Sequence, residues 1–387
     1  MEKTVKNENI MKKGMPLWYI PAWASRSISV AVSVVILMQA TFYSTEVLGL
    51  NAGLVGMIIL VSKLFDGFTD LIVGFIIDRT NTKLGKARPY ELFIIPLWIC
   101  IFLFFSTPDF GITGKVIYVF VLYTLINSIC ATFLYGSETV YLGRAVVEED
   151  KRGKILAVSG LLVMLFSAIA SMLLPTLMVS WGTEPGGWSR IALIYAVPMI
   201  VLGVIRFFTI KEQGVDAKQE EANKVGFKEG IKMLTQNKYV FILSIIIMLA
   251  NLVQNIVSIT GTYYFTYVMG NLGLLSLVGL LGLAAPFVLL LFPVAMRTIG
   301  AVGFVRIGLL LAAIANIVRF VFPTSLPVVL VTVMISGIGA STITMMNSFF
   351  ILQCIDYGEY KLGKRVEGLP TAVNNFTAKV GSGIASV

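Results

Sequence analysis

The chain has 387 residues, of which 57% are hydrophobic and 13% are charged, and its mean hydropathy is +0.87. Soluble domains carry about 25% charged residues, so this composition excludes an ordinary soluble protein and predicts a protein of the lipid bilayer. The net charge of +9 does not indicate a nucleic-acid partner, because Lys and Arg gather between apolar runs, as the positive-inside rule expects of cytoplasmic loops.

Apolar runs of membrane-spanning length follow one another along the chain, since about 20 apolar residues cross the hydrocarbon core. The first six predicted helices cover residues 17–44, 52–77, 91–107, 114–142, 155–180 and 188–209. A polar stretch then ends at Lys238, and four more predicted helices cover residues 239–268, 272–295, 302–322 and 326–355. An eleventh begins near Leu369 and still continues at Val387.

Six helices, a polar linker and a second group of helices are typical of transporters with two six-helix halves. We therefore expect an N-terminal six-helix bundle (1–209), a central cytoplasmic linker (210–238) and an incomplete C-terminal bundle (239–387). Because the last apolar run has no basic flank and no twelfth helix follows, we expect a truncated or fragmentary chain. The alternative is a native protein with eleven helices.

Basic residues predict the orientation. They cluster before the first predicted helix and after the second, fourth and tenth, whereas residues 45–51 and 106–114 contain none. Because basic loops stay in the cytoplasm, we expect a cytoplasmic N-terminus in a multi-pass protein of the plasma (inner) membrane.

The second predicted helix carries charges on one face. Lys63, Asp66 and Asp70 are separated by three and four residues, and Thr69 adds a hydroxyl beside them. A charged side chain at the centre of a membrane helix costs about 2.5–3.5 kcal/mol, and two adjacent carboxylates repel. A shared Na⁺, Li⁺ or H⁺ would relieve this repulsion, and Lys63 would pair with the acids when no cation is bound. The alternative is a set of solvated charges at a helix end.

The fourth predicted helix offers neutral oxygen ligands. Thr132 and Asn127 lie in its interior and would complete the cation site, and Asn127 is also a candidate for contact with the solute or for its coupling, together with Lys63. Equally, such side chains often bond to the preceding turn of their own helix. Glu138 is closer to the cytoplasmic end, and we interpret it as a gate or interface charge.

Two cytoplasmic loops share an acidic residue at a helix end followed by a basic turn. The first contains Asp78, Arg79 and Arg88, and the second contains Asp356 and Arg365. Asp–Arg pairs in these loops would close a cytoplasmic gate. The simpler alternative is that the basic residues only fix the topology.

The final apolar run contains Lys379, and an intramembrane lysine needs a partner. Asp66 and Asp70 are the candidates, which would join the two halves. Asn375, about one turn earlier, and the adjacent Asn374 could bond a polar solute. The alternative for Lys379 is a side chain that extends to the membrane interface.

No metal-ligand cluster, phosphate-binding loop or nucleophile elbow is found in the sequence, so we expect neither an enzyme nor a cofactor. The three cysteines, Cys100, Cys130 and Cys354, lie in or beside apolar runs and are expected to be small core residues. The chain has no histidine, so a proton relay would depend on carboxylates, Lys or Tyr.

Four stretches resemble the glycoside–pentoside–hexuronide:cation symporters, the melibiose-carrier family within the major facilitator superfamily. They are VLGLNAGLVG, FDGFTD, GFIIDRTNTKLGKARPY and DYGEYKLGKRVEG, the last followed by Lys379. The resemblance implies the all-α major facilitator fold. It also implies that Asp66 and Asp70 bind the coupling cation, that Thr69 influences which cation is accepted, and that Lys379 links the cation and sugar sites.

Departures from the family pattern affect the sugar half of the site. The acid of the first helix has no counterpart, and that stretch offers Arg26 instead. The acidic position of the fourth helix matches Thr132 and Gly136, and the arginine of the fifth helix is missing.

These features predict a secondary active transporter that couples Na⁺ or H⁺, with Li⁺ as a further candidate, to uptake of a sugar or glycoside by alternating access. A transporter of a non-sugar, amphiphilic solute is the first alternative. A non-transporting or truncated membrane protein is the second. We expect a monomer whose partners are a small solute and the bilayer.

Overall fold

The structure is a computed structural model that describes residue 16 and residues 18–146, 149–212, 237–282, 292–362 and 368–387. Helices account for almost all of this part of the chain. Its β-structure is limited to one isolated bridge between Thr82 and Gly85. The prediction of an all-α protein is therefore confirmed for these residues.

The chain divides into two compact units. Unit 1 comprises Met1–Asn51 and Phe65–Val215, and unit 2 comprises Ala52–Leu64 and Asp216–Val387. The beginning of helix α4 thus groups with the second unit and its remainder with the first. The predicted domain boundaries at residues 209 and 238 stay a prediction.

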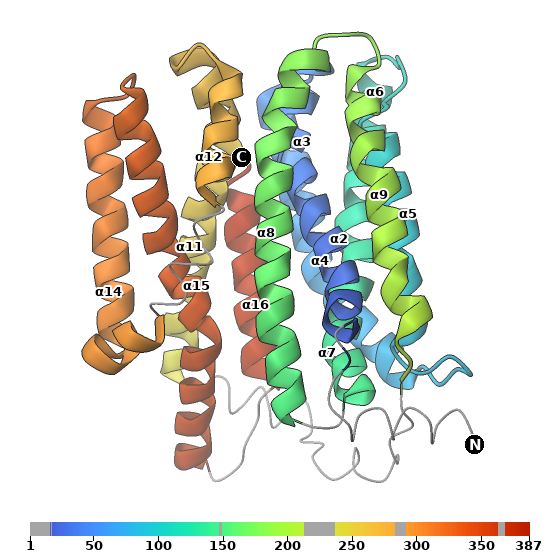
Figure 1. The fold of residues 1–387 in the computed structure, drawn as a ribbon, viewed down its shortest axis with the longest axis vertical. Helices are drawn as coiled ribbons and strands as arrows, with labels where there is room; N and C mark the ends of the chain where they lie inside the picture. Colours follow the sequence, from blue (N-terminus) through green and yellow to red (C-terminus); the bar gives the residue numbers. More distant parts are fainter. Residues whose placement is uncertain (1–15, 17, 147–148, 213–236, 283–291, 363–367) are drawn as a thin grey trace. The chain divides into compact units, whose positions relative to one another are not determined.

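Unit 1 is built from helices that follow the first six apolar runs (Figure 1). They are α2 (Tyr19–Leu37), α3 (Ala40–Phe42), η1 (Tyr43–Val47), α4 (Ala52–Arg79, shared with unit 2), η2 (Arg88–Phe93), α5 (Ile94–Phe104), α6 (Ile112–Thr124), η3 (Leu125–Ala131), α7 (Thr132–Ala145), α8 (Glu149–Trp181) and α9 (Gly187–Thr209).

Helix α2 packs against α8 and α9, and α9 also packs against α5. Gly203 permits the close approach, because a Cβ atom there would lie 2.6 Å from the Ile94 side chain and 3.0 Å from Ser29 Oγ. Ser29 is buried at this crossing, donates to the backbone oxygen of Met199 (2.7 Å) and accepts from the Trp98 indole N–H (2.9 Å). Small residues and interhelical hydrogen bonds are how membrane helices associate, because lipid provides little hydrophobic drive.

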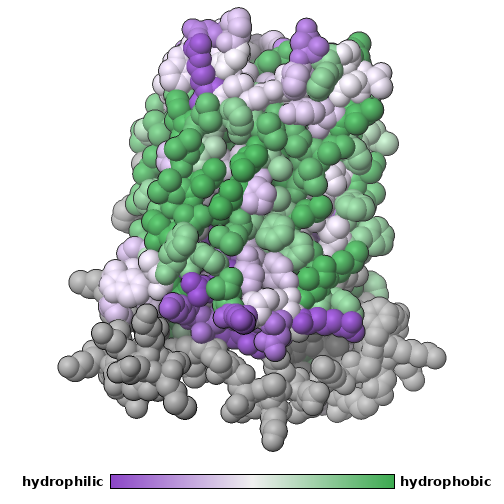
Figure 2. All heavy atoms as spheres, turned by 90° about the vertical axis from the view of Figure 1, so that its right-hand side faces the viewer, coloured by the Kyte–Doolittle hydropathy of each residue, from purple (hydrophilic) through white to green (hydrophobic). Residues whose placement is uncertain are grey.

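The outer face of α9 is apolar. Val197, Val201 and Phe208, spaced by four and seven residues, are exposed, the last two at 61% and 68%. Figure 2 shows a face of the molecule on which hydrophobic side chains form a broad central band, with hydrophilic residues above and below it. An apolar belt of this kind suits hydrocarbon and not water.

Unit 2 contains the start of α4 and the later helices. These are α11 (Lys238–Tyr263), η5 (Tyr264–Val268), η6 (Leu272–Leu274), α12 (Leu275–Gly282), α14 (Phe292–Val321), α15 (Leu326–Leu362) and α16 (Gly368–Ile384).

Glycines set the helix spacing in unit 2 as well. Helix α14 packs against α15, where a Cβ on Gly339 would lie 2.2 Å from the backbone oxygen of Gly308. Helix α16 packs against α11, where a Cβ on Gly381 would lie 2.2 Å from the Met248 oxygen. At Gly56 on α4, a Cβ would lie 2.2 Å from the backbone oxygen of Ser386. In each case the nearest atom is a backbone oxygen, which cannot move aside as a side chain can, so a larger side chain would force the two segments apart.

Seven helical segments of the described residues are long and apolar enough to cross a membrane. They are Tyr19–Val47, Ile112–Ala145, Lys154–Trp181, Gly187–Thr209, Lys238–Val268, Thr298–Val321 and Leu326–Lys361. The chain is a multi-pass membrane protein, and the predicted number of eleven spans stays a prediction.

Candidate cation site and ion network

A π-helical turn lies directly before Thr132 at the candidate cation site. Helix α6 continues through the π-helix η3 into α7. In this stretch the Asn127 side-chain amide donates to the backbone oxygen of Tyr123 (2.9 Å), and the Thr132 hydroxyl donates to the backbone oxygen of Asn127 (3.1 Å). Single π-helical turns interrupt the regular ladder and are frequent at functional sites.

The Thr132 hydroxyl also contacts the carboxylate of Asp66, with 2.9 Å between Thr132 Oγ1 and Asp66 Oδ1. Asp66 is 5% exposed and Thr132 is 4% exposed. The Thr69 hydroxyl donates to the backbone oxygen of Asp66 at 3.0 Å. The structure therefore brings Asp66, Thr132 and the backbone carbonyl of Asn127 together, whereas the Asn127 side-chain amide bonds within its own helix. Their role in cation binding stays a prediction.

Close packing of α4 on α7 explains this meeting. A Cβ on Gly136 would lie 3.2 Å from Ile77 Cδ1 and 3.5 Å from Val73 Cγ1. Gly136 is one turn beyond Thr132, and Val73 is two turns beyond Asp66, so the same two helix faces meet at both levels.

The oxygens at this point suit a hard monovalent cation or a proton. A carboxylate, a hydroxyl and a backbone carbonyl are the ligand types that hard cations take. Asp70, four residues beyond Asp66, is half-buried and adds a second carboxylate to the same helical stripe. In the described ranges no group of three or more His, Cys, Asp or Glu is placed to hold a metal ion.

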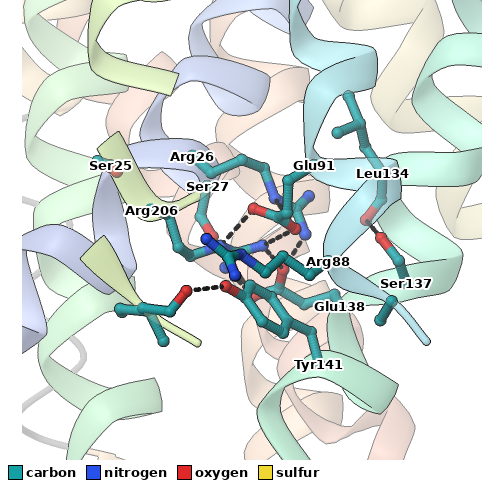
Figure 3. Close-up of polar contacts among 12 residues, drawn as sticks. Ser25, Arg26, Ser27, Arg88, Glu91, Leu134, Ser137, Glu138, Tyr141 and Arg206 are labelled. Atoms are coloured by element: carbon teal, nitrogen blue, oxygen red, sulfur yellow. Dashed lines mark hydrogen bonds and ion pairs between the residues drawn. The ribbon is translucent and has the colours of Figure 1, made fainter. Parts of the chain in front are cut away.

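A second polar cluster of unit 1, which we call the ion network, joins Arg26, Glu91, Glu138 and Arg206 (Figure 3). These residues belong to α2, η2, α7 and α9, respectively, and their side chains point toward one another. Arg26, Glu91 and Arg206 are at most 2% exposed, and the Glu138 side chain is 24% exposed.

Arg206 is the centre of the ion network. Its Nε and Nη2 atoms each lie 2.6 Å from a Glu91 carboxylate oxygen. Its Nη1 and Nη2 atoms lie 3.0 Å and 2.7 Å from the two oxygens of Glu138. The guanidinium also stacks on the rings of Trp23 (4.5 Å) and Tyr141 (5.1 Å). This buried cation is therefore compensated by two carboxylates and contacts two aromatic rings, as burial of a charge requires.

Arg26 balances the remaining charge. It forms an ion pair with Glu138 and a longer contact, 3.4 Å, with Glu91. Two guanidinium groups thus face two carboxylates, so the cluster is formally neutral. The arrangement ties four helical elements of unit 1 together, and each of the four charges in the ion network faces an opposite charge.

The sequence revealed this network only in part. Glu138 was predicted to be a gate or interface charge, and Arg26 was noted only as a departure from a family pattern. Glu91 and Arg206 were not singled out. The available signal was the presence of opposite charges within or beside separate apolar runs, because each such charge needs a partner in a membrane.

Three backbone N–H groups hold the carboxylate of Glu212 near the end of α9. Glu212 accepts hydrogen bonds from the backbone N–H groups of Lys86 (2.9 Å), Ala87 (2.7 Å) and Arg88. Consecutive N–H groups of this kind form an anion-binding nest. Gly85 has a φ of +120°, and a Cβ there would lie 2.6 Å from the carboxyl carbon of Glu212. The turn before η2 is thereby fastened to the residues after α9.

The predicted gate residues occupy separate environments. Arg88 donates two hydrogen bonds to the backbone oxygen of Phe207, at 3.0 Å and 2.7 Å, and so holds the end of α9. Arg79 is exposed and its guanidinium stacks 3.9 Å from the Phe75 ring. Asp356 is exposed at the end of α15.

The side chain of Asp78 and the whole of Arg365 lie outside the described part of the structure. An Asp–Arg gate at either loop therefore stays a prediction.

Of the residues predicted to contact or couple the solute, Asn127 lies in unit 1 and the other three lie in unit 2. Lys379 and Lys63 are half-buried, and Asn375 is exposed. The neighbouring Asn374 is the buried amide, 2% exposed, and donates to the Asn347 side chain at 3.0 Å, which links α16 to α15. The roles proposed from sequence for Lys379, Lys63 and Asn375, including the pairing of Lys379 with the acids of α4, stay predictions.

Comparison with known proteins reveals one family. The sequence model described as MFS/sugar transport protein matches residues 18–387. A protein of Bacillus subtilis (strain 168) described as the uncharacterized symporter YnaJ is 32% identical over 89% of this chain and 76% of its own length. The isoprimeverose transporter of Lactiplantibacillus pentosus is 27% identical over 89% and 72% of the two chains. The glucuronide carrier protein homolog of Escherichia coli (strain K12) is 27% identical over 88% and 75%.

Solved structures with the same fold are transporters. The nucleoside transporter NupG gives a TM-score of 0.63 at 14% identity and covers 95% of this chain and 88% of its own. A bacterial homolog of the human lysosomal transporter Spinster, inward-facing and unoccupied, gives 0.66 at 15% identity and covers 95% and 80%. These identities are too low to indicate more than a shared fold.

Proposed function

The chain belongs to the family of MFS/sugar transport proteins, and from this premise we propose that it is a secondary active transporter coupling Na⁺ or H⁺ movement to uptake of a sugar or glycoside. The resemblance to glycoside, pentoside and hexuronide symporters is confirmed by the family match and by the relatives. The family and these relatives are transporters and not enzymes. The major facilitator fold is likewise confirmed.

The contact between Thr132 and Asp66 carries the proposal of cation coupling. In our mechanism, Na⁺ or H⁺ binds the Asp66 and Asp70 carboxylates, with Thr132 as a neutral ligand and Thr69 holding the Asp66 backbone. Binding neutralises the acids and removes the cost of burying their charge. The loaded and the empty site then favour different members of an alternating-access pair, which is the condition for coupling.

We propose a sugar or glycoside as the solute because two relatives are an isoprimeverose transporter and a glucuronide carrier protein homolog. Lys379 and Asn375 are our candidates for contact with the solute and for its coupling to the cation. A non-sugar solute remains the alternative, since the sequence lacks the acid that the family places on the first helix.

We further propose that the protein is a monomer in the plasma (inner) membrane with a cytoplasmic N-terminus. The distribution of Lys and Arg between the apolar runs supports this orientation.

The test is uptake of a panel of labelled glycosides into proteoliposomes, with and without an inward Na⁺ or H⁺ gradient. We expect gradient-driven uptake of at least one glycoside, its loss in Asp66→Asn, and no change in Asp109→Asn. Asp109 is the matched control because its side chain is 98% exposed and pairs only with Lys115 in the described structure. Equal coupling in wild type and Asp66→Asn would contradict the cation assignment, and absence of uptake for every glycoside would favour a non-sugar solute.

A further inference from the structure

Three aromatic rings of unit 1 gather at the start of helix α7. Phe133, the residue after Thr132, stacks on the Tyr90 ring with 4.9 Å between the centroids and 13° between the planes. It also stacks on the Phe93 ring, at 4.5 Å and 26°. Both partners belong to η2, which packs against α7. Because stacked rings prefer a defined separation and orientation, these two contacts fix the place of the Phe133 side chain on η2.

The aromatic stack is anchored to the end of helix α4. The hydroxyl groups of Tyr90 and Thr80 form a hydrogen bond. Since the Thr80 hydroxyl gives its single proton to the backbone oxygen of Ile76 (2.8 Å), Tyr90 is the donor to Thr80. Thr80 follows the last residue of α4, which is the helix that carries Asp66. The stack therefore joins α7 to the same helix as the candidate cation site does.

The Thr132 hydroxyl has one proton and two acceptors within reach. Its oxygen lies 2.9 Å from Asp66 Oδ1 and 3.1 Å from the backbone oxygen of Asn127. When a cation occupies the carboxylate, the proton can turn to Asn127, and the lone pairs of the hydroxyl then face the cation. A neutral ligand of this kind works only while its oxygen keeps its place between the two acceptors.

Rotation of α7 would displace this oxygen. A rotation by about 20° moves each Cα by about 0.8 Å, given a helix radius of about 2.3 Å, and moves a side-chain oxygen farther. Hard cations hold their oxygen ligands within a range of about 0.3 Å. We propose that Phe133 is a positioning residue of the candidate cation site, because its stack on η2 holds α7 at the rotation in which the Thr132 hydroxyl reaches both acceptors. This inference rests on the proposed function, and the competing interpretation is that the three rings only pack the interior of unit 1.

The affinity of the full-length chain for the coupling cation is the quantity to measure. Titration calorimetry in detergent gives the Kd for Na⁺ without any solute; if Na⁺ does not bind, the external H⁺ concentration at half-maximal uptake takes its place. Phe133→Ala should weaken the affinity by about three- to tenfold, the range that one aromatic pair contributes. Phe133→Tyr keeps the ring and should retain the wild-type affinity. Phe110→Ala is the matched control and should also retain it, because the Phe110 ring is 45% exposed and contacts Tyr118 (5.8 Å) elsewhere in unit 1.

A double variant separates positioning from general packing. Because Phe133 acts through the Thr132 hydroxyl, adding Phe133→Ala to Thr132→Val should weaken the cation affinity no further. Melting profiles show whether each variant is folded. If Phe133→Ala does not fold, Phe133→Leu, which keeps apolar volume but not the stacked ring, takes its place and should also weaken the affinity.

The possible failures are distinguishable. Wild-type affinity in a folded Phe133→Ala variant would overturn the role of Phe133 and leave the proposed function standing. Equal losses in the wild-type and Thr132→Val backgrounds would do the same, because the effect would then not pass through the hydroxyl. If the wild-type protein neither binds Na⁺ nor shows uptake driven by H⁺, the proposed function itself fails, and the positioning role fails with it.

Discussion

Replacing Glu91 with glutamine should destabilise the protein strongly while hardly changing its shape. Glu91 is fully buried, accepts two hydrogen bonds of 2.6 Å from Arg206 and lies 3.4 Å from Arg26. Glu91→Gln removes one negative charge and leaves two guanidinium groups facing the single carboxylate of Glu138.

The magnitude follows from the geometry. Hydrogen bonds to charged groups contribute about 1.5–3 kcal/mol each, and two are weakened. Breaking a buried ion pair by removing one partner costs about 3–5 kcal/mol. Both routes predict a loss of about 3–5 kcal/mol in the free energy of unfolding of Glu91→Gln.

Equilibrium denaturant titration in mixed micelles, followed by tryptophan fluorescence, measures this loss. Glu184→Gln is the matched control, because Glu184 pairs with Arg190 at 3.0 Å but both side chains are about half exposed. Exposed pairs contribute about 0–1 kcal/mol. If Glu91→Gln costs no more than Glu184→Gln, our account of the ion network is wrong.

A double-mutant cycle separates charge from packing. Glu91→Gln combined with Arg206→Met leaves Arg26 paired with Glu138, so the cluster is neutral again. We expect the double variant to be more stable than the sum of the single losses predicts, with a coupling energy between about 0.5 and 3 kcal/mol. Strict additivity would mean that the two groups do not interact.

Further predictions concern the candidate cation site and the turn before η2. Thr132→Val removes the hydroxyl that binds Asp66, so the KM for the coupling cation should rise in uptake assays. Thr132→Ser keeps a hydroxyl and should retain the wild-type KM. Equal KM values for the two variants would contradict the proposed role of the Thr132 hydroxyl in cation binding. Glu212→Ala removes the acceptor of three backbone N–H groups, worth about 1–3 kcal/mol locally, so limited trypsin digestion should cleave more rapidly after Lys86. Gly85→Ala, which places a Cβ against that carboxylate, should increase the same cleavage, and unchanged digestion of both variants would show that the nest does not hold the turn.

The positions of the long helices were predictable from the sequence. Contacts between two helices were predictable only when both helices carried a polar or charged side chain within an apolar run. The apolar runs located the helices of both units, and the acids of α4 pointed to Thr132. The π-helix η3 left no signal, since its residues are as apolar as their neighbours. On α16 the buried amide is Asn374 and the exposed one is Asn375; adjacent residues differ by about 100° around a helix, so the sequence alone did not fix which of the two faces inward.

The pairing within the ion network was not predicted from the sequence, for a different reason. Arg206 lies 115 residues from Glu91 and 68 residues from Glu138, so no local pattern connects them. Charge balance could be checked from sequence, but pairing depends on which helices pack together, and that is a property of the tertiary structure.

The order of these residues along the chain also has a consequence for membrane insertion. Synthesis delivers α2, η2 and α7 before α9, so Arg26, Glu91 and Glu138 precede Arg206. Before α9 is synthesised, the three residues carry a net charge of −1, and burying an unpaired charge in hydrocarbon is energetically costly. The early helices must therefore stay in contact with water or with the insertion machinery until Arg206 joins them. Helix α9 thus supplies, last in the order of synthesis, the positive charge that completes the ion network of unit 1.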